Sequence, residues 1–439
     1  MSGANFLLSS DAARILIDCG LFQGSAALEE KNYAVFPYEP SSITHVLVTH
    51  AHVDHIGRLP KLVRDGFKGE IISTEATKAI SEHLLGDSME LLKRDAQKRG
   101  KEPLYGEEDV AAALRRWRGT SYGTGIPLPG GFTARLRNAG HILGSAMVEF
   151  VRDGRKLVAT GDLGNNSSEL LDPAEQVTDA QYLLIESVYG DKENNPALRR
   201  DELEDSIEDT VARGGTLLIP AFSTERTQDL IYEVRTLMNE KRVPSVPVFV
   251  DSPLASRVTA SFLSHPSYFK KEIASRIERG EDLFAFDELR FTQSREESRR
   301  IAEVKGPKII IAGSGMSTGG RVLAHAREYL KDPKSTFLIV GYQSAGSLGR
   351  RLLEGEKRVE IFEEKVDVKA TIQAIYGYSA HRDGNGLLDF IAQGADALEK
   401  VCVAMGEPRS SSFLTQRIRD YLGVDAVAPR MGESVGLVL

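Results

Sequence analysis

Cysteine is scarce in this sequence. Only Cys19 and Cys402 occur among 439 residues, and both stand in apolar, strand-like surroundings. Two isolated thiols exclude the disulfide framework of a small secreted protein, and they do not form the paired motifs of cysteine-ligated zinc sites. We therefore expect two buried thiols and a cytoplasmic protein.

Long apolar runs are also missing. The longest, such as 216–220 and 336–340, are far shorter than the roughly 20 residues that span a bilayer. Residues 1–10 contain neither a basic region nor an apolar core. The sequence therefore predicts no secretory signal and no membrane partner.

Basic residues are not in excess. The 55 lysines and arginines against 63 acidic residues give a formal charge of −8, which excludes a general nucleic-acid coating protein. A nuclease is not excluded, because bound metal ions supply positive charge locally. The composition is that of a soluble globular protein, and the length predicts two domains or one domain with a large insertion.

Histidine is concentrated in one stretch. The chain has nine histidines, and three of them fall within His50-Ala51-His52-Val53-Asp54-His55. The β-branched run 44–49 predicts a buried strand, so this cluster begins where a strand ends. Three imidazoles and a carboxylate at a strand end predict a metal site with nitrogen and oxygen ligands. The alternative is a polar loop that happens to be rich in histidine.

Single acidic or histidine residues stand at or beyond the ends of five other predicted strands. Strand ends are where loops project into a shared crevice, so we expect these side chains to approach the histidine cluster. A lone histidine is as often structural as functional, and its meaning depends on the cluster. The five residues are Asp18, His141, Asp162, Glu186 and His381.

From about Asp191 the sequence alternates between helix-like and strand-like segments. This rhythm predicts a compact parallel-sheet domain with a ligand crevice at the carboxyl ends of its strands. Small and polar residues stand at those ends, among them Gly313-Ser314-Gly315-Met316 and Gly341-Tyr342-Gln343. The charged stretch 265–305 predicts helix, and 366–376 predicts a strand.

Together these motifs resemble the metallo-β-lactamase superfamily and, within it, the β-CASP nucleases. Glu186 in Glu-Ser-Val-Tyr-Gly and His381 in Ser-Ala-His-Arg-Asp resemble the first two β-CASP motifs. The Gly-Ser-Gly-Met and Gly-Tyr-Gln turns resemble the inserted domain of the RNA-processing branch, which includes the cleavage-and-polyadenylation endonuclease. Four metal-site motifs are matched, in order, by Asp18, the His50–His55 cluster, His141 and Asp162.

The resemblance implies an α/β fold, an αββα sandwich in which two sheets pack face to face with helices outside. An α/β β-CASP cap domain would be inserted into the sandwich. We expect residues 1–190 to form the N-terminal part of the metallo-β-lactamase domain, 191–369 the cap and 370–439 the C-terminal return. The active site would lie in the cleft between the domains.

The resemblance also implies a ligand set. His50, His52 and His141 would hold one Zn²⁺, and Asp54 and His55 a second. Asp162 would bridge the two ions, and Asp18 would orient the ligand loops.

A mechanism follows from this ligand set. Two ions supply a metal-bound hydroxide and neutralise the charge on a phosphodiester under attack. His381 would protonate the leaving 3′-oxygen, with Glu186 holding its ring and favouring its protonated form. The catalytic residues expected are therefore Asp54, His381 and Glu186.

Four residues are candidates for contacts with substrate phosphates. Arginine forks and small-residue turns suit phosphate geometry, although each is weak evidence alone and a glycine-rich turn is as often structural. The candidates are Arg226, Ser314, Arg321 and Ser379.

One position departs from the family pattern. The RNA-processing branch has a histidine just before Gly-Glu that completes the second zinc site, and here Met405 stands in that place. A thioether is a poor zinc ligand among nitrogen and oxygen donors, so we expect the second ion to be weakly held. The DNA-processing branch carries an apolar residue there, so the change alone does not abolish activity. The chain also starts later than the family usually does, where an edge strand is expected, and this indicates divergence.

The leading hypothesis is a zinc-dependent ribonuclease that hydrolyses single-stranded RNA. One alternative is a DNA nuclease of the same family. Another is a catalytically weakened RNA-binding scaffold, against which the many intact motifs argue. The sequence leaves open endonuclease or exonuclease action, the natural RNA, and whether the protein forms a homodimer.

Overall fold

The computed structural model of this chain describes residues 3–165, 168–193, 196–341, 343–344 and 346–439. It divides into two compact units, Met1–Glu193 with Ala380–Leu439, and Asn194–Ser379. The chain thus changes units after residues 193 and 379, whereas the sequence suggested changes after residues 190 and 369. Every helix in the described part of the chain is too short or too polar to span a bilayer.

Two β-sheets form the centre of the first unit. Ile17 and Leu47 of one sheet pack in a common core with Val148 and Phe150 of the other. The first sheet has the order β1 (Phe6–Ser9), β2 (Arg14–Ile17), β3 (His45–Leu47), β4 (Glu70–Thr74), β5 (Trp117–Thr120). The second has the order β20 (Ala426–Val427), β19 (Lys400–Ala404), β10 (Tyr182–Glu186), β9 (Arg155–Ala159), β8 (Ala146–Arg152), β7 (Thr133–Asn138), β6 (Ile126–Pro127).

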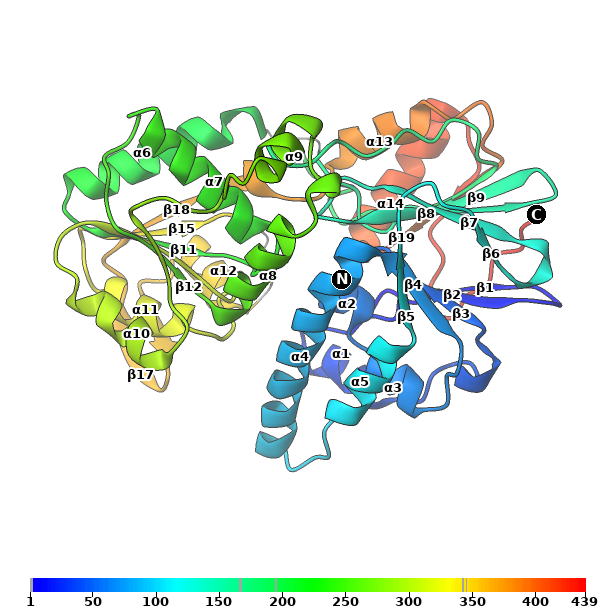
Figure 1. Ribbon diagram of the computed structural model, residues 1–439, viewed down its shortest axis with the longest axis horizontal. Helices are drawn as coiled ribbons and strands as arrows, with labels where there is room; N and C mark the ends of the chain where they lie inside the picture. Colours follow the sequence, from blue (N-terminus) through cyan, green and yellow to red (C-terminus); the bar gives the residue numbers. More distant parts are fainter. Residues whose placement is uncertain (1–2, 166–167, 194–195, 342, 345) are drawn as a thin grey trace. The chain divides into compact units, whose positions relative to one another are not determined.

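Helices cover the outer faces of both sheets and complete the αββα sandwich, as Figure 1 shows for this unit. On the first sheet, α4 (Glu75–Lys98) packs on β4 and β5 and contacts α5 (Glu107–Arg115). On the second, α13 (Gly384–Ala392) and α14 (Pro408–Arg417) form a core with β10 and β19. The fold class that the resemblance implied is confirmed.

The edge strand of the first sheet is present despite the short start of the chain. β1 pairs antiparallel with β2, with Phe6 opposite Ile17, and it occupies the edge of the sheet. Residues 6–9 therefore form an edge strand, as the family pattern has near its start.

Six parallel strands form the sheet of the second unit. In Figure 1, α6 (Arg199–Ala212) and α7 (Arg226–Asn239) lie on one face of it, and α10 (Arg295–Arg300) and α11 (Val322–Tyr329) lie on the other. A separate hairpin joins β16 (Arg358–Ile361) to β17 (Glu364–Asp367). The sheet order is β13 (Leu289–Phe291), β12 (Val248–Asp251), β14 (Lys308–Ala312), β11 (Thr216–Pro220), β15 (Thr336–Ile339), β18 (Thr371–Ala374).

Two segments of this unit differ from the sequence expectation. The stretch 265–305, expected to be helical, contains α9 (Lys271–Glu278), the edge strand β13 and α10. A three-residue strand among charged residues is too short to give an alternating pattern. The single strand expected at 366–376 is divided between β17 and β18, which belong to different sheets. Tyr342 of the Gly-Tyr-Gln motif lies outside the described residues.

Candidate metal centre

In each sheet of the first unit, the predicted metal-site residues follow the carboxyl ends of neighbouring parallel strands. β2 and β3 are parallel with Ile17 opposite Leu47, so Asp18 and the histidine cluster follow at the same edge. In the other sheet β9, β10 and β19 are parallel, with Glu186 opposite Ala404. Asp162, Glu186 and Met405 therefore leave that sheet on one side.

The turn before Asp162 must pass very close to the histidine cluster. Gly161 has a φ of 54°, and a Cβ atom at this position would lie 2.6 Å from Cβ of Thr49. Both the left-handed conformation and the close approach require glycine here. The glycine thus allows the Asp162 carboxylate to reach the cluster from the opposite sheet.

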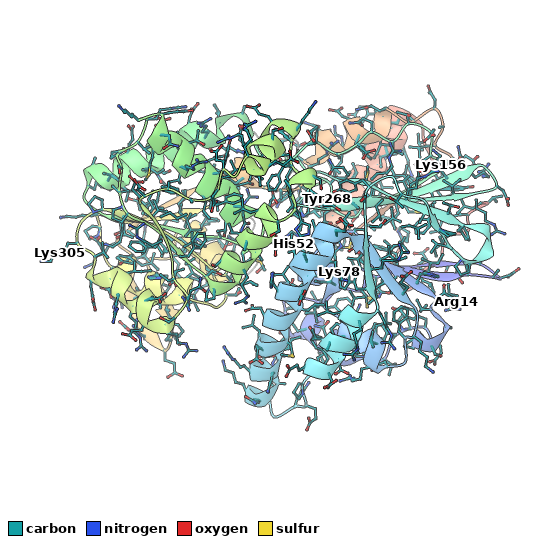
Figure 2. All side chains as sticks on the ribbon, viewed as in Figure 1. Arg14, His52, Lys78, Lys156, Tyr268 and Lys305 are labelled. Atoms are coloured by element: carbon teal, nitrogen blue, oxygen red, sulfur yellow. The ribbon has the colours of Figure 1, made fainter. Side chains whose placement is uncertain are left out.

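Three imidazoles and one carboxylate converge at the centre. His50, His52, His141 and Asp162 each offer one ligand atom, and these four atoms lie within 4.8 Å of one another. Nε2 of His141 and Nδ1 of His52 are 3.3 Å apart, and Nε2 of His50 is 3.0 Å from the same Nδ1. His52 caps the N-terminus of α2 (Val53–Ile56) and is labelled in Figure 2. The remaining contacts are those of Asp162 Oδ2, 3.5 Å from His50 Nε2 and 3.6 Å from His141 Nε2.

The three converging imidazoles are held in their neutral form. Burial lowers the pKa of His50 and of His141 well below the ordinary value, and neighbouring histidines lower both further. Burial also lowers the pKa of His52 to about 4. A neutral imidazole has a ring nitrogen lone pair available for a metal ion. Their protonation state therefore suits metal ligation at neutral pH.

Asp18 fixes the orientation of the histidine cluster through hydrogen bonds from Thr49 and a close contact with His55. Its Oδ1 accepts a hydrogen bond from the backbone N–H of Thr49 at 2.8 Å, and its Oδ2 accepts one from the Thr49 hydroxyl at 2.8 Å. The same Oδ2 lies 2.7 Å from Nδ1 of His55. Thr49 Oγ1 also lies 3.0 Å from Nδ1 of His50. The Nδ1 atoms of both histidines are thus engaged, which leaves their Nε2 atoms directed toward Asp162.

Two buried polar atoms at the centre fit a metal ion. Nε2 of His55 and Oδ1 of Asp162 face each other at 3.4 Å, and neither has a hydrogen-bond partner among the described residues. His55 is 1% exposed and Asp162 is 3% exposed, so bulk water does not satisfy them. The two atoms form an ion pair when His55 is protonated, and a cation bound between the imidazole and the carboxylate would take the place of that proton. The nitrogen and oxygen donors present here fit zinc.

Asp54 and His55 do not join a converging group of their own. Among the described residues, the second group whose atoms meet the same limit of 4.8 Å is Asp162, Glu186 and His381. Asp54 is half-buried on α2, and its charge raises the pKa of both His52 and His381. It therefore lies close to the centre without converging as tightly as the three imidazoles do.

Met405 lies near His55 and Asp18. It follows β19 with a φ of 62° and borders a cavity of about 10 Å³. Asp18, His55 and Glu186 border the same cavity. Met405 therefore lies near His55, one of the two residues expected to bind a second ion.

Half-buried His381 and fully buried Glu186 form a pair next to the imidazoles. Nδ1 of His381 lies 3.1 Å from Oε2 of Glu186 and 3.9 Å from Oδ2 of Asp162. Burial would lower the pKa of His381, but Glu186 first and then Asp162 raise it to about 9. Glu186 is itself fixed, because its Oε1 accepts a hydrogen bond from the Leu163 N–H at 2.6 Å. His381 can therefore hold a proton at neutral pH.

The four candidates for phosphate contacts lie in the second unit, where the two arginines are held by aromatic and acidic partners. Arg226 is buried over the ring of Tyr378, with its guanidinium carbon 5.5 Å from the ring centroid. Arg321 donates to Asp251 Oδ1 at 2.6 Å and to the Gln293 carbonyl at 2.8 Å. These contacts favour structural roles for both arginines. Ser314 lies in the turn after β14, where its hydroxyl accepts a hydrogen bond from the Thr318 N–H at 3.2 Å, and Ser379 is buried.

Two residues near the metal centre were not singled out from the sequence. Thr49 joins Asp18 to His50, and its sequence signal is its position before the cluster. The ring of Tyr189, inside the Glu-Ser-Val-Tyr-Gly motif, lies edge-on to His381 at 5.8 Å. Asp251, by contrast, was among the strand-end residues of the second unit expected to face a ligand crevice. It is fully buried at the end of β12 and bonds to Arg321 and His325.

Three family models match the chain. The metallo-beta-lactamase superfamily matches residues 2–195, the Beta-Casp domain matches 227–352, and the Zn-dependent metallo-hydrolase RNA specificity domain matches 365–429. Along the chain, the first and third matches flank the Beta-Casp match.

Relatives match over nearly the whole chain. Ribonuclease TTHA0252 of Thermus thermophilus is 36% identical over 99% of this chain and 97% of its own length. Transcription termination factor FttA of Methanosarcina mazei is 30% identical over 99% of this chain and 69% of its own length. The crystal structure of a protein of unknown function from Enterococcus faecalis V583 covers 98% of this chain and 96% of its own, with a TM-score of 0.55 and 12% identity, and it shows the fold alone. The chain belongs to the metallo-β-lactamase superfamily and, within it, to the β-CASP family of metal-dependent hydrolases.

Proposed function

We propose that this protein is a zinc-dependent ribonuclease that hydrolyses phosphodiester bonds of single-stranded RNA. The observation that carries the proposal is the juxtaposition of two groups that share Asp162. One is the set of neutral imidazoles from His50, His52 and His141, and the other is the pair of His381 and Glu186. A metal-binding set beside a proton donor is what hydrolysis of a phosphodiester needs.

The metal set would be built from residues of both sheets. His50, His52, His141 and Asp162 are proposed to hold one ion, and Asp54 and His55 would share a second ion with Asp162. Bound at this place, the ions would activate water and neutralise charge on the phosphate group. Asp18 would keep the Nδ1 side of His55 occupied, so that only its Nε2 faces the ions.

The proton that the leaving oxygen needs is assigned to His381. Its Nδ1 faces Glu186, which stabilises the charged ring and fixes its orientation. The other ring nitrogen, Nε2, is then the atom that can give a proton to the leaving 3′-oxygen. Glu186 acts through His381 and does not contact the substrate in this scheme.

We propose zinc as the metal, and we expect the protein to bind the first ion more tightly than the second. The donors are imidazole and carboxylate, which suit zinc, and the third matched family is described as Zn-dependent. The first ion would have four converging ligands. The second would have fewer, because Met405 stands where a histidine is expected and a thioether is a poor zinc ligand.

RNA is proposed as the substrate for two reasons. The domain matched at 365–429 is described as an RNA specificity domain, and a relative that matches 99% of the chain is named a ribonuclease. Ser314 and Ser379 are kept as proposed contacts to phosphate. A cytoplasmic location is proposed because the two cysteines are free thiols, which suit a reducing compartment.

A DNA nuclease is the second candidate, favoured by the apolar residue at Met405. Digestion of matched single-stranded RNA and DNA oligonucleotides, labelled at one end, separates the two. We expect zinc-replete protein to cut the RNA at least about tenfold faster than the DNA, a difference of about 1.4 kcal/mol in barrier height. Equal rates, or faster cutting of DNA, would overturn the choice of RNA. The positions of the first products distinguish endonuclease from exonuclease action.

A further inference from the structure

Exposed aromatic residues and an arginine share one face of the last long helix. Phe413, Arg417 and Tyr421 are spaced by four along α14 and the π-helical turn η8 (Ile418–Leu422). Phe413 is 49% exposed and Tyr421 is 71% exposed. We call these three residues the α14 stripe. Single exposed hydrophobic residues are common, but two large rings aligned on one helix face are not explained by chance exposure alone.

Arg417 lies between the two rings. Its guanidinium carbon is 5.9 Å from the centroid of Phe413 and 5.8 Å from the centroid of Tyr421. Its Nη2 donates to Oδ1 of Asn385 at 2.8 Å, and because this amide is neutral the contact does not cancel the positive charge. The stripe therefore presents a ring, a planar cation and a second ring in succession.

The inner face of the same helix is firmly attached to the first unit. Leu414 and Ile418 are fully buried in the core formed with β10 and β19. The rings of the stripe thus stand on a rigid support, and their exposure is not the result of a frayed end. A binding surface on a packed helix loses little conformational entropy when a ligand binds.

The first turn of α14 is bonded to the segment that carries Tyr189. Arg409 lies 3.3 Å from Oδ2 of Asp191, and the Ser410 hydroxyl donates to Oδ1 of Asp191 at 2.6 Å. Tyr189 stands two residues before Asp191, and its ring centroid lies 5.8 Å from that of His381. The helix that carries the stripe is therefore connected through Asp191 and Tyr189 to a residue proposed to cut RNA.

We propose that the α14 stripe is a binding site for single-stranded RNA outside the metal centre. Bases of any sequence can stack on Phe413 and Tyr421, and the guanidinium group of Arg417 can stack on a base or contact a phosphate. The family match described as an RNA specificity domain covers this helix. The naming of RNA rests on the proposed function. A protein partner is less suited, because the charged Arg417 divides the two rings and leaves no continuous apolar patch.

Charge supports the same occupant. The chain as a whole is acidic, with a formal charge of −8, so attraction of a polyanion must come from local groups. Arg409, at the start of the helix, is paired with Asp191 at 3.3 Å, so its charge is largely balanced. Arg417 bonds to the neutral amide of Asn385 and keeps its positive charge between the two rings. Arg417 is therefore the cation that the stripe offers to a phosphate or a base.

Equilibrium binding of a labelled single-stranded oligouridylate with phosphorothioate linkages, which slow hydrolysis, tests the proposal on zinc-replete full-length protein. Fluorescence anisotropy gives Kd. We expect Phe413→Ala and Tyr421→Ala each to raise Kd about tenfold, the effect typical of one lost stacking contact. Phe413→Trp should bind as well as the unchanged protein. Arg417→Lys, which keeps the charge and loses the planar group, should also weaken binding.

Phe362→Ala is the matched control. Phe362 is 58% exposed with the guanidinium carbon of Arg327 5.9 Å from its ring centroid, and it lies on the other unit. Its loss should leave Kd unchanged. If Phe413→Ala and Tyr421→Ala also leave Kd within about twofold while thermal unfolding is unaltered, the stripe is not an RNA site. Self-association that is lost in these variants at unchanged Kd would likewise overturn the proposal and indicate a contact between copies.

Cleavage of bis(p-nitrophenyl) phosphate separates this proposal from the proposed function. The small diester cannot span the stripe, so stripe variants should cleave it at the unchanged rate. If the unchanged protein cleaves neither this diester nor RNA, the proposed function fails while the binding result on the stripe still stands. If stripe variants lose cleavage of the small diester, the substitutions disturb the centre and the stripe assignment is wrong.

Discussion

Oδ2 of Asp18 lies 2.7 Å from Nδ1 of His55, and this pair is fully buried. The contact fixes which nitrogen of His55 is free, because Nδ1 donates to the carboxylate and Nε2 is left facing Asp162 at 3.4 Å. An acid that binds the far nitrogen of a metal-ligating histidine sets its tautomer and its orientation. The relationship therefore connects the first acidic strand end in the chain to the centre of the proposed site.

Asp18→Asn is expected to weaken metal binding without unfolding the protein. The amide cannot carry the charge that makes the His55 ring a strong donor, and residues in this supporting role change metal affinity by about 10–100-fold. Competition with a chromogenic zinc chelator measures the affinity. Asp11→Asn, on the exposed turn between β1 and β2, is the control and should bind zinc as before. An unaltered affinity in Asp18→Asn would remove the orienting role.

Met405→His is expected to raise the bound zinc toward two ions per chain. The new imidazole would stand beside the cavity that Met405 shares with His55 and Asp18. Mass spectrometry under native conditions counts the ions, and Met405→Leu controls for the change in side-chain shape. Unchanged stoichiometry in Met405→His would mean that this position does not face the second ion.

His381→Asn should slow RNA cleavage by about 10²–10⁴-fold, the usual contribution of a positioned proton donor, and leave zinc content unchanged. Bis(p-nitrophenyl) phosphate has a leaving group that needs no proton, so its cleavage should be much less affected. Glu186→Gln should show the same pattern more weakly. Because His381 also converges with Asp162 and Glu186, a loss of zinc together with equal losses on both substrates would identify it as a metal ligand instead.

Much of the centre could be predicted because its signals are local. His50, His52 and His55 stand within six positions, and Asp162 follows a strand and precedes a turn with glycines. What the sequence did not reveal was the difference between the ligands. Asp54 is half-buried and outside the converging group, although it stands inside the same motif. Helix α2 starts at Val53, and this helical turn separates Asp54 from the imidazoles.

The fold was predictable where strands were buried and long. The apolar runs 216–220 and 336–340 contain β11 and β15, because continuous apolar runs mark strands covered on both faces. The edge strand β13 was missed, since it has three residues among charged neighbours. The partners of Arg226 and Arg321 could not be predicted either, because Tyr378 and Asp251 are distant in sequence and meet them only in the folded sheet.

We expect the free energy of unfolding to decrease at acid pH, because Asp251 loses its charge there. Burial would raise its pKa, but hydrogen bonds from His325, Ser298, Thr292 and Arg321 lower it from 3.8 to about 2. Because the folded-state pKa is depressed, the ionised carboxylate contributes on the order of 2 kcal/mol above the unfolded pKa. That contribution is lost as pH falls from about 4 toward about 2.

Urea unfolding of the unchanged protein and of Asp251→Asn measures this effect. At neutral pH the variant should lose about 3 kcal/mol, because Arg321 is left without its buried counter-charge. Between pH 5 and pH 3 the difference between the two proteins should shrink by about 1 kcal/mol. A difference that stays constant over this range would show that Asp251 is not ionised in the folded state.

Metal content and RNA cleavage measured on the same preparations test the central claim most directly. Protein stripped with a chelator, protein restored with zinc, and zinc-restored Asp54→Ala would each be analysed for bound metal and incubated with end-labelled single-stranded RNA. We predict no cleavage after stripping, recovery on restoring zinc, and a loss of at least about 10²-fold in the variant. Cleavage that survives stripping, zinc-replete protein that leaves RNA intact, or a variant that cuts as fast as the unchanged protein would contradict a zinc-dependent ribonuclease.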